Sequence, residues 1–254
     1  MKLIELSRSD FARHDKRRIK DLVDENVLVV VRHFYDESLI LDFRQELKAF
    51  ALSREQSWHP LYNDCPDYHR INDEYENSYV KARTHTFLFH LWYEHNRRLF
   101  EMFKETFVFK SELLGKDASY VTSNIPSDGY ISRVTVHQYP IGGGYLSEHV
   151  DPVNAFNPVQ TIIPASIRGV DYKSGGLYVR PDGSDLLLLD DKIGIGDLVM
   201  FNQQIPHGVL PVEPDEKLTW DLDSGRWLII PITVRSDYIK NQTENVKQLS
   251  FGAK

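Results

Sequence analysis

The spacing of hydrophobic residues changes near residue 118. Before that point apolar residues recur at helical periods, and one helix is predicted over residues 9–23, where Ser9 and Asp10 can cap the first turn. A second helix is predicted from about residue 36, with apolar residues on one face at Leu39, Phe43, Leu47 and Phe50. Residues 27–31 are a β-branched apolar run, which is typical of a buried strand.

Residues 53–84 follow neither a helical nor a strand period. Aromatic and histidine residues are mixed there with Asn, Asp and Pro, which predicts a long irregular loop. Two roles are open for its larger side chains, a lid over a substrate or ordinary packing of a helical cap; these are Trp58, Tyr62, His69, Arg70 and Tyr79. Residues 86–114 predict a third helix, with Phe89, Trp92, Leu99 and Phe103 on its apolar face.

Short apolar runs separated by Gly, Pro and Asp follow Gly115. They predict strands over residues 130–139, 160–166, 175–180, 186–189, 197–202 and 226–235. Six or more short strands favour a sandwich or barrel, so the chain is expected to be one α+β domain. The acidic, turn-rich residues 211–225 predict an inserted surface loop, with covering of the site as a second role.

Composition narrows the classes of partner. The 254 residues include 30 Lys and Arg against 37 Asp and Glu, a formal charge of -7, which disfavours nucleic acids and anionic membranes. The single cysteine, Cys65, cannot form an intramolecular disulfide, which fits a reducing compartment and excludes a cysteine-based zinc site. Neither a spanning apolar segment nor a secretory signal is recognisable, so we expect a cytoplasmic protein.

Three residues carry the candidate chemistry: His149, Asp151 and His207. Residues two apart on a strand share a face, so His149 and Asp151 can lie side by side, and His207 follows another predicted strand. Two histidines and one carboxylate form the facial triad that binds Fe(II) and leaves three positions open. Taken alone, the His149–Asp151 pair is weak evidence for a metal site, because most such pairs are a histidine in a polar turn hydrogen-bonded to a nearby aspartate.

Residues 133–231 resemble the Fe(II)/2-oxoglutarate-dependent dioxygenase superfamily, in particular its prolyl-hydroxylase-like branch. Four motifs occur in the family's order: Tyr139-Pro140 with residues 142–145 before His149 and Asp151, residues 174–177, residues 196–201, and Gly225-Arg226-Trp227. The resemblance implies a double-stranded β-helix, or jelly roll, over residues 119–240. Residues 1–118 would supply mainly helical support, and residues 241–254 a tail.

The same resemblance implies Fe(II) at His149, Asp151 and His207, with 2-oxoglutarate as cosubstrate at Arg226 and Tyr139. Arg226 opens an apolar strand, so its guanidinium is expected at the barrel rim, where it can grip a carboxylate with two nitrogens. Arg235, at the far end of that strand, is the rival anchor. The separation of nineteen residues between His207 and Arg226 is longer than the motif usually shows, and the acidic loop is expected to account for the excess.

Arg133 lies six residues before Tyr139 and therefore on the same strand face. It can meet an anionic group of either ligand, cosubstrate or substrate. A surface ion pair is the remaining interpretation of this residue.

The expected reaction uses 2-oxoglutarate and O2 to hydroxylate a C–H bond, with release of succinate and CO2. The complete triad argues against the related halogenases, which replace the carboxylate of Asp151 with a small residue. Demethylation, desaturation and ring closure begin with the same hydrogen abstraction and stay open. The expected substrate is a small metabolite, amino acid, peptide or sugar unit.

Two other classes remain as alternatives. A cupin-like metal-dependent isomerase predicts that Arg226 is dispensable. A noncatalytic binding protein on a jelly-roll scaffold predicts that neither His149 nor His207 matters to activity.

Overall fold

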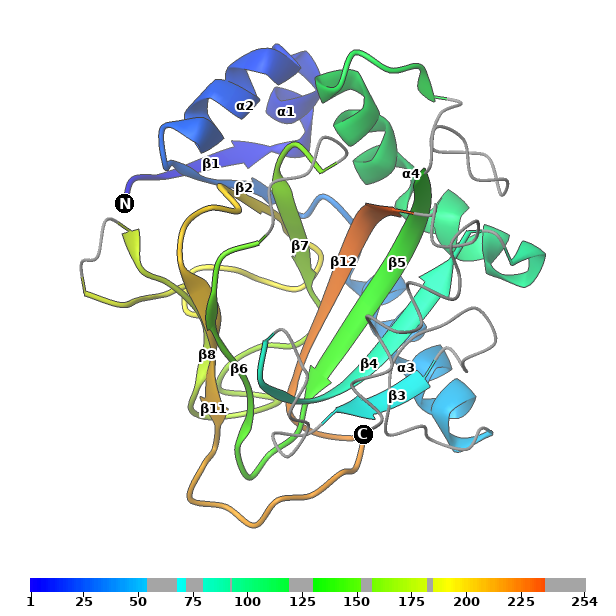
Figure 1. Ribbon diagram of the computed structural model, residues 1–254, viewed down its shortest axis with the longest axis vertical. Coiled ribbons are helices and arrows are strands. Elements are labelled where there is room, and N and C mark those ends of the chain that lie inside the picture. The colour runs from blue at the N-terminus through cyan, green and yellow to red at the C-terminus, as the bar shows by residue number, and fades with distance from the viewer. Residues whose placement is uncertain are drawn as a thin grey trace, which may run out of the picture.

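Twelve strands in one curved sheet dominate the computed structural model, which describes residues 1–53, 68–71, 80–91, 93–118, 130–151, 157–181 and 185–235 (Figure 1). The strands are β1 (Leu3–Ser7), β2 (Leu28–Arg32), β3 (Tyr68–Ile71), β4 (Ala82–His90), β5 (Tyr130–Tyr139), β6 (Gly144–His149), β7 (Gln160–Pro164), β8 (Gly176–Val179), β9 (Leu187–Leu188), β10 (Leu198–Phe201), β11 (His207–Val212) and β12 (Arg226–Arg235). The helices are α1 (Arg8–Arg13), α2 (Lys16–Asp24), α3 (Glu37–Leu52), the 3-10 turn η1 (Glu94–Asn96) and α4 (Arg97–Leu113).

Strands β5 to β12 pair as two antiparallel groups. One group has the order β5, β12, β7, β10, and the other has the order β6, β11, β8, β9. Strand β4 pairs with both β5 and β6 and so joins the groups. The chain passes repeatedly from one group to the other, and this mostly-sheet arrangement is consistent with a jelly-roll oxygenase fold.

Alternation along the central strands produces two apolar cores. Trp227 and Ile229 of β12 belong to a cluster with Phe43 of α3 and Phe103 of α4, so this face of the sheet is covered by helices. Leu228, between them in sequence, points the other way into a second cluster that includes Phe201 and Val209. The second cluster fills the space between the two strand groups, because every second side chain of the facing strands points into that space.

The N-terminal segment supplies the helices expected of residues 1–118, and it also extends the sheet, which was not anticipated. Strand β2 pairs with β10 and β1 pairs in parallel with β2, while β3 and β4 continue the sheet beyond β5. The helix predicted over residues 9–23 is two helices, because Asp15 caps the first turn of α2. The strand at 27–31 and the helix from residue 36 are confirmed as β2 and α3.

The helix predicted over residues 86–114 begins only at Arg97. Its first residues belong to β4, where Phe87 and Phe89 pack in the helix-covered core while Thr86 and His90 face the opposite side. Both faces of β4 are buried, so its sequence lacks the polar alternation that marks a half-exposed strand. The irregular loop predicted at 53–84 is wrong where it includes β3, in its middle, and the start of β4, at its end; residues 54–67 and 72–79 lie outside the described part of the chain.

The second half of the chain agrees closely with its predicted strands. The expected strands at 130–139 and 226–235 match β5 and β12, which pair over their whole length. Strands β6 and β11 were not anticipated, and β11 continues to Val212 before the acidic loop begins. The suggested lid residues Trp58, Tyr62 and Tyr79 and the tail at 241–254 lie outside the described residues. Among the helices that are described, none has the length and apolar character needed to cross a membrane.

Candidate metal centre

His149, Asp151 and His207 come together between the two strand groups. His149 ends β6, His207 begins β11, and the two residues are directly paired across these strands. One carboxylate oxygen of Asp151 lies 3.7 Å from Nε2 of His149, and the other lies 3.6 Å from Nε2 of His207. The three potential ligand atoms all lie within 4.8 Å of one another, which is the grouping expected around one metal ion.

Backbone carbonyls fix the direction of both imidazoles. Nδ1 of His149 lies 2.9 Å from the Ser147 carbonyl oxygen, and Nδ1 of His207 lies 2.8 Å from that of Ile205. When Nδ1–H donates to these carbonyls, Nε2 keeps its lone pair and faces Asp151. Metal-binding histidines are commonly held in this way, so the donor set fits a divalent ion with nitrogen and oxygen ligands, such as Fe(II).

Asp151 lies beyond the end of β6 and is held there by side chains and backbone of the neighbouring strands. Its amide donates to the Gln203 carbonyl at 3.0 Å, and Gln160 donates from Nε2 to Oδ2 at 2.8 Å. Gln204 donates to the Asp151 carbonyl oxygen at 2.6 Å. The carboxylate is therefore oriented without needing the strand to continue to residue 151.

The pKa values of the two histidines are shifted in opposite directions. Burial lowers the pKa of His207, and the nearby His149 lowers it further. Burial also opposes protonation of His149, but the Asp151 carboxylate and the Ser147 carbonyl outweigh it and raise the pKa of His149 above its ordinary value of 6.5. In the metal-free centre, His149 therefore binds a proton more readily than His207 does.

A buried amine lies behind the centre. The side chain of Lys110 in α4 donates from Nζ to Asn157 Oδ1 and to the Pro231 carbonyl oxygen, both at 2.7 Å. Asn157 in turn contacts Gln203 at 3.4 Å, the residue whose carbonyl holds Asp151. Burial lowers the pKa of Lys110 to about 7, with the charge of Asp151 opposing this shift.

Arg226 is buried rather than at the rim, and its guanidinium fork already has a carboxylate. Nε and Nη2 donate to the two oxygens of Asp190 at 2.6 and 2.9 Å, and the side chains of Arg226 and Asp190 are 2% and 4% exposed. The predicted two-nitrogen grip on a ligand is therefore wrong as stated. Nη1 remains buried and has no hydrogen-bond partner among the described residues, so one nitrogen is left for an anion.

Tyr139 packs beside the guanidinium of Arg226. The guanidinium carbon of Arg226 is 5.7 Å from the centre of the Tyr139 ring, and the two residues are paired across β12 and β5. Burial raises the pKa of Tyr139, so its hydroxyl stays protonated and can donate a hydrogen bond. A buried guanidinium with one unpartnered nitrogen, packed against a buried tyrosine, fits the distal carboxylate of 2-oxoglutarate.

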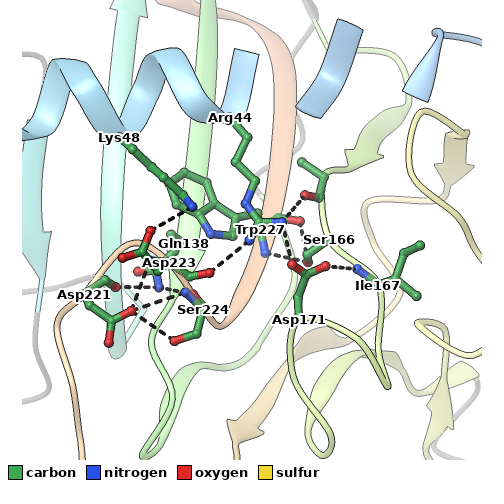
Figure 2. A network of polar contacts seen from close by, with 11 residues as sticks. Arg44, Lys48, Gln138, Ser166, Ile167, Asp171, Asp221, Asp223, Ser224 and Trp227 are labelled. Carbon is green, nitrogen blue, oxygen red and sulfur yellow. Dashed lines mark hydrogen bonds and ion pairs between the residues drawn. The ribbon is translucent and has the colours of Figure 1, made fainter. Parts of the chain in front are cut away.

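The acidic loop before Arg226 is attached to the outer, helix-covered side of the sheet. Figure 2 shows Arg44 and Lys48 extending from α3, where Lys48 pairs with Asp223 at 3.0 Å and Arg44 pairs with Asp171 at 2.7 Å. Gln138 donates from Nε2 to the carbonyl oxygens of Asp221 and Ser224 at 3.2 and 2.8 Å. These contacts anchor the end of the loop on the face opposite the metal ligands.

Strand β5 carries three more polar residues on the same face as Tyr139, namely His137, Thr135 and Arg133. His137, which the sequence reasoning missed, lies 2.9 Å by Nδ1 from Thr86 Oγ1, and burial with the charges of Arg133, Arg226 and His149 lowers its pKa to about 3. Its position two residues before Tyr139 was the available signal. Arg133 donates from Nε to Thr135 Oγ1 at 2.9 Å. It is separated from Tyr139 by six residues, roughly 20 Å of extended strand.

The remaining residues of the site gave weaker signals in the sequence. Asp190 and Gln160 were not anticipated, and both contact a predicted site residue through side-chain hydrogen bonds. The rival anchor Arg235 ends β12, and its side chain lies outside the described residues. His69 and Arg70, suggested for the lid, belong to β3.

Comparison with known proteins bears on the fold. No family model and no curated protein matches the chain. A prolyl-4-hydroxylase from Pseudomonas putida is 12% identical, with 87% of this chain and 99% of that chain covered and a TM-score of 0.54. The non-haem alpha-ketoglutarate-dependent epimerase SnoN of nogalamycin biosynthesis is 10% identical, with 87% and 82% covered and a TM-score of 0.51. The predicted resemblance is therefore confirmed for the fold, which this chain shares with a prolyl-4-hydroxylase.

Proposed function

We propose that this chain is a non-haem Fe(II)- and 2-oxoglutarate-dependent oxygenase. Its reaction is the hydroxylation of a C–H bond in a small metabolite, amino acid, peptide or sugar unit, with release of succinate and CO2. The observation that carries the proposal is the triad of His149, Asp151 and His207, whose ligand atoms converge within 4.8 Å. The shared fold with a prolyl-4-hydroxylase supports the same conclusion.

The strand pairing supports a double-stranded β-helix as the core of a single domain. The two groups, β5-β12-β7-β10 and β6-β11-β8-β9, alternate along the chain as such a core requires. His149 and His207 come from adjacent strands of one group, while Tyr139 and Arg226 come from adjacent strands of the other. The core therefore presents metal ligands and anion donors from opposite walls of one interior.

Each residue has a defined task in this proposal. His149, Asp151 and His207 would hold Fe(II) on one side and leave three positions for 2-oxoglutarate and O2. Fe(II), 2-oxoglutarate and O2, when bound together, would supply the oxidising power that removes a hydrogen atom from the substrate. Arg226 Nη1 and the Tyr139 hydroxyl would donate to the distal carboxylate of 2-oxoglutarate and so orient its keto acid toward the metal.

An anaerobic optical titration tests the proposal directly. The metal-free protein receives Fe(II) and then 2-oxoglutarate, and the expected result is the visible charge-transfer band of a metal-chelated keto acid. His149→Ala should lack the band because one metal ligand is gone, while its far-ultraviolet circular dichroism stays that of the wild type. Folded, iron-loaded wild type without a band would sink the proposal.

A second titration separates this function from the cupin-like isomerase. Arg226→Ala should raise the 2-oxoglutarate concentration needed for half-maximal band intensity, because Nη1 is removed. A wild-type band that is insensitive to Arg226→Ala would favour a metal site that does not use the distal carboxylate.

A further inference from the structure

We infer that Asp190 is a positioning residue for the cosubstrate site, and that it turns Arg226 so that Nη1 alone faces the ligand. The inference rests on the proposed function, because it assigns 2-oxoglutarate as the anion that meets Nη1. Asp190 contacts no metal ligand in the described part of the chain. It acts through Arg226.

Four donors converge on the Asp190 carboxylate. Oδ2 accepts from Arg226 Nε at 2.6 Å, from the Tyr172 hydroxyl at 2.5 Å and from the Leu177 amide at 2.9 Å. Oδ1 accepts from Arg226 Nη2 at 2.9 Å. A carboxylate with this many donors, in a residue only 8% exposed, has one orientation available and cannot turn away from the guanidinium.

The chain around Asp190 is shaped to admit this carboxylate. A Cβ atom on Gly176 would lie 2.2 Å from Asp190 Oδ2, and Gly176 has a φ of +121°, so only glycine fits there. The glycine that begins β8 therefore has a local cause, since the backbone must approach the acid closely enough for the Leu177 amide to donate. The carboxylate is built into the core and is not a mobile surface charge.

Pairing with Asp190 determines what Arg226 can offer to a ligand. The edge formed by Nε and Nη2 is committed to Asp190, and Nη1 is the buried guanidinium nitrogen without a partner in the described part of the chain. The charges of Arg226 and Asp190 also cancel. Binding of the 2-oxoglutarate distal carboxylate therefore depends less on net charge than on the positions of Nη1 and the Tyr139 hydroxyl. The affinity for the distal carboxylate should therefore depend on Asp190, although Asp190 itself repels an anion and acts only by orienting Arg226.

The same chain segment supports Arg226 from the outer side of the sheet. Tyr172, which donates to Asp190, follows Asp171, whose carboxylate pairs with Arg44 (Figure 2). The Asp171 carbonyl oxygen accepts from the Gly225 amide at 3.1 Å. Asp171 thus fixes Gly225, the residue before Arg226, and its neighbour Tyr172 fixes the Asp190 carboxylate that pairs with Arg226. This double support explains how the guanidinium keeps its orientation after a long loop.

The experiment measures dissociation constants for two keto acids with the anaerobic Fe(II) protein, by charge-transfer band titration. 2-Oxoglutarate has the distal carboxylate, whereas pyruvate has the keto acid alone. Asp190→Asn should weaken 2-oxoglutarate binding about tenfold or more, which corresponds to the loss of one charge-assisted hydrogen bond. Pyruvate binding should stay within about twofold, because it does not reach Arg226; a tenfold change corresponds to about 1.4 kcal/mol.

Asp191→Asn is the matched control. Asp191 is the next residue, is 53% exposed in its side chain and pairs with Arg168, so its substitution should leave both dissociation constants unchanged. Tyr172→Phe removes one donor to Asp190 without touching Arg226, and should weaken 2-oxoglutarate binding by about threefold. This second variant carries the test if Asp190→Asn does not fold.

The outcomes separate this inference from the proposed function. A wild-type band with unchanged or tighter 2-oxoglutarate binding in Asp190→Asn overturns the positioning role and leaves the function standing. Equal weakening of 2-oxoglutarate and pyruvate also overturns it, since that result indicates general damage to the metal centre. A folded wild type without any band overturns the function and this inference together.

Discussion

The buried amine of Lys110 predicts an unusual dependence of stability on pH. Its Nζ donates only to the Asn157 side chain and the Pro231 carbonyl, with no carboxylate at ion-pair distance within the described residues. Burial lowers its pKa from 10.5 to about 7. Lys110→Met removes the charge and keeps most of the side-chain length, so the two proteins should differ by the ionisation of one group.

The sign follows from the two pKa values. Between pH 7 and 10.5 the unfolded chain keeps the proton on Lys110 while the folded protein has released it, so stability rises with pH in this window. Below pH 7 the full cost of burying the charge is present, on the order of 5 kcal/mol, and between pH 7 and 9 roughly 2 kcal/mol of it is relieved. Lys110→Met lacks this gain.

Urea unfolding of the metal-free protein at pH 7, 8 and 9 measures the effect. The free energy of unfolding of the wild type should rise relative to that of Lys110→Met by roughly 2 kcal/mol over this range. Lys104→Met is the control, because this lysine lies on the same helix with a 46% exposed side chain and pairs with Glu101. A constant difference between wild type and Lys110→Met at all three pH values would refute the low pKa and the reasoning from burial.

Three further results are expected. Arg44→Met should lower the free energy of unfolding by about 3 kcal/mol in urea, because it leaves the largely buried Asp171 carboxylate without its partner; an unchanged midpoint would contradict this. Gly176→Ala should weaken 2-oxoglutarate binding in the band titration, since its Cβ would displace Asp190 Oδ2, and unaltered affinity would show that the carboxylate is free to move. Co(II) affinity, followed by visible absorption, should rise from pH 5.5 to 7.5 because the raised pKa of His149 makes protons compete with the metal, whereas a flat profile would exclude that competition.

The elements that could be predicted were those whose local sequence agrees with their final environment. Strand β12 is a long, nearly continuous apolar run that Gly225 precedes, and β5 alternates apolar and polar residues between Gly129 and Pro140, so the bounds of both strands were correct. Strand β4 was misassigned because its contiguous apolar residues are buried between the helices and the interior, and such a run fits a helix as well as a strand. Tertiary burial decided between them.

The metal ligands could be predicted because their residue types are rare and their spacing is local or bounded by a recognisable strand. The environment of Arg226 could not, because its partner lies 36 residues earlier in a Leu-rich stretch that ends in two aspartates. Asp190 and Asp191 are identical in type and adjacent, yet Asp190 is enclosed by Arg226, Tyr172 and Leu177 while Asp191 faces solvent. Both aspartates lie in the turn after β9, and the course of that turn decides which carboxylate points inward; sequence spacing alone does not encode it. An arginine at the start of an apolar strand therefore predicts a buried anionic partner, but that partner can be a carboxylate of the protein itself, such as Asp190. A ligand anion would then bind the guanidinium nitrogen that the internal carboxylate leaves unpaired.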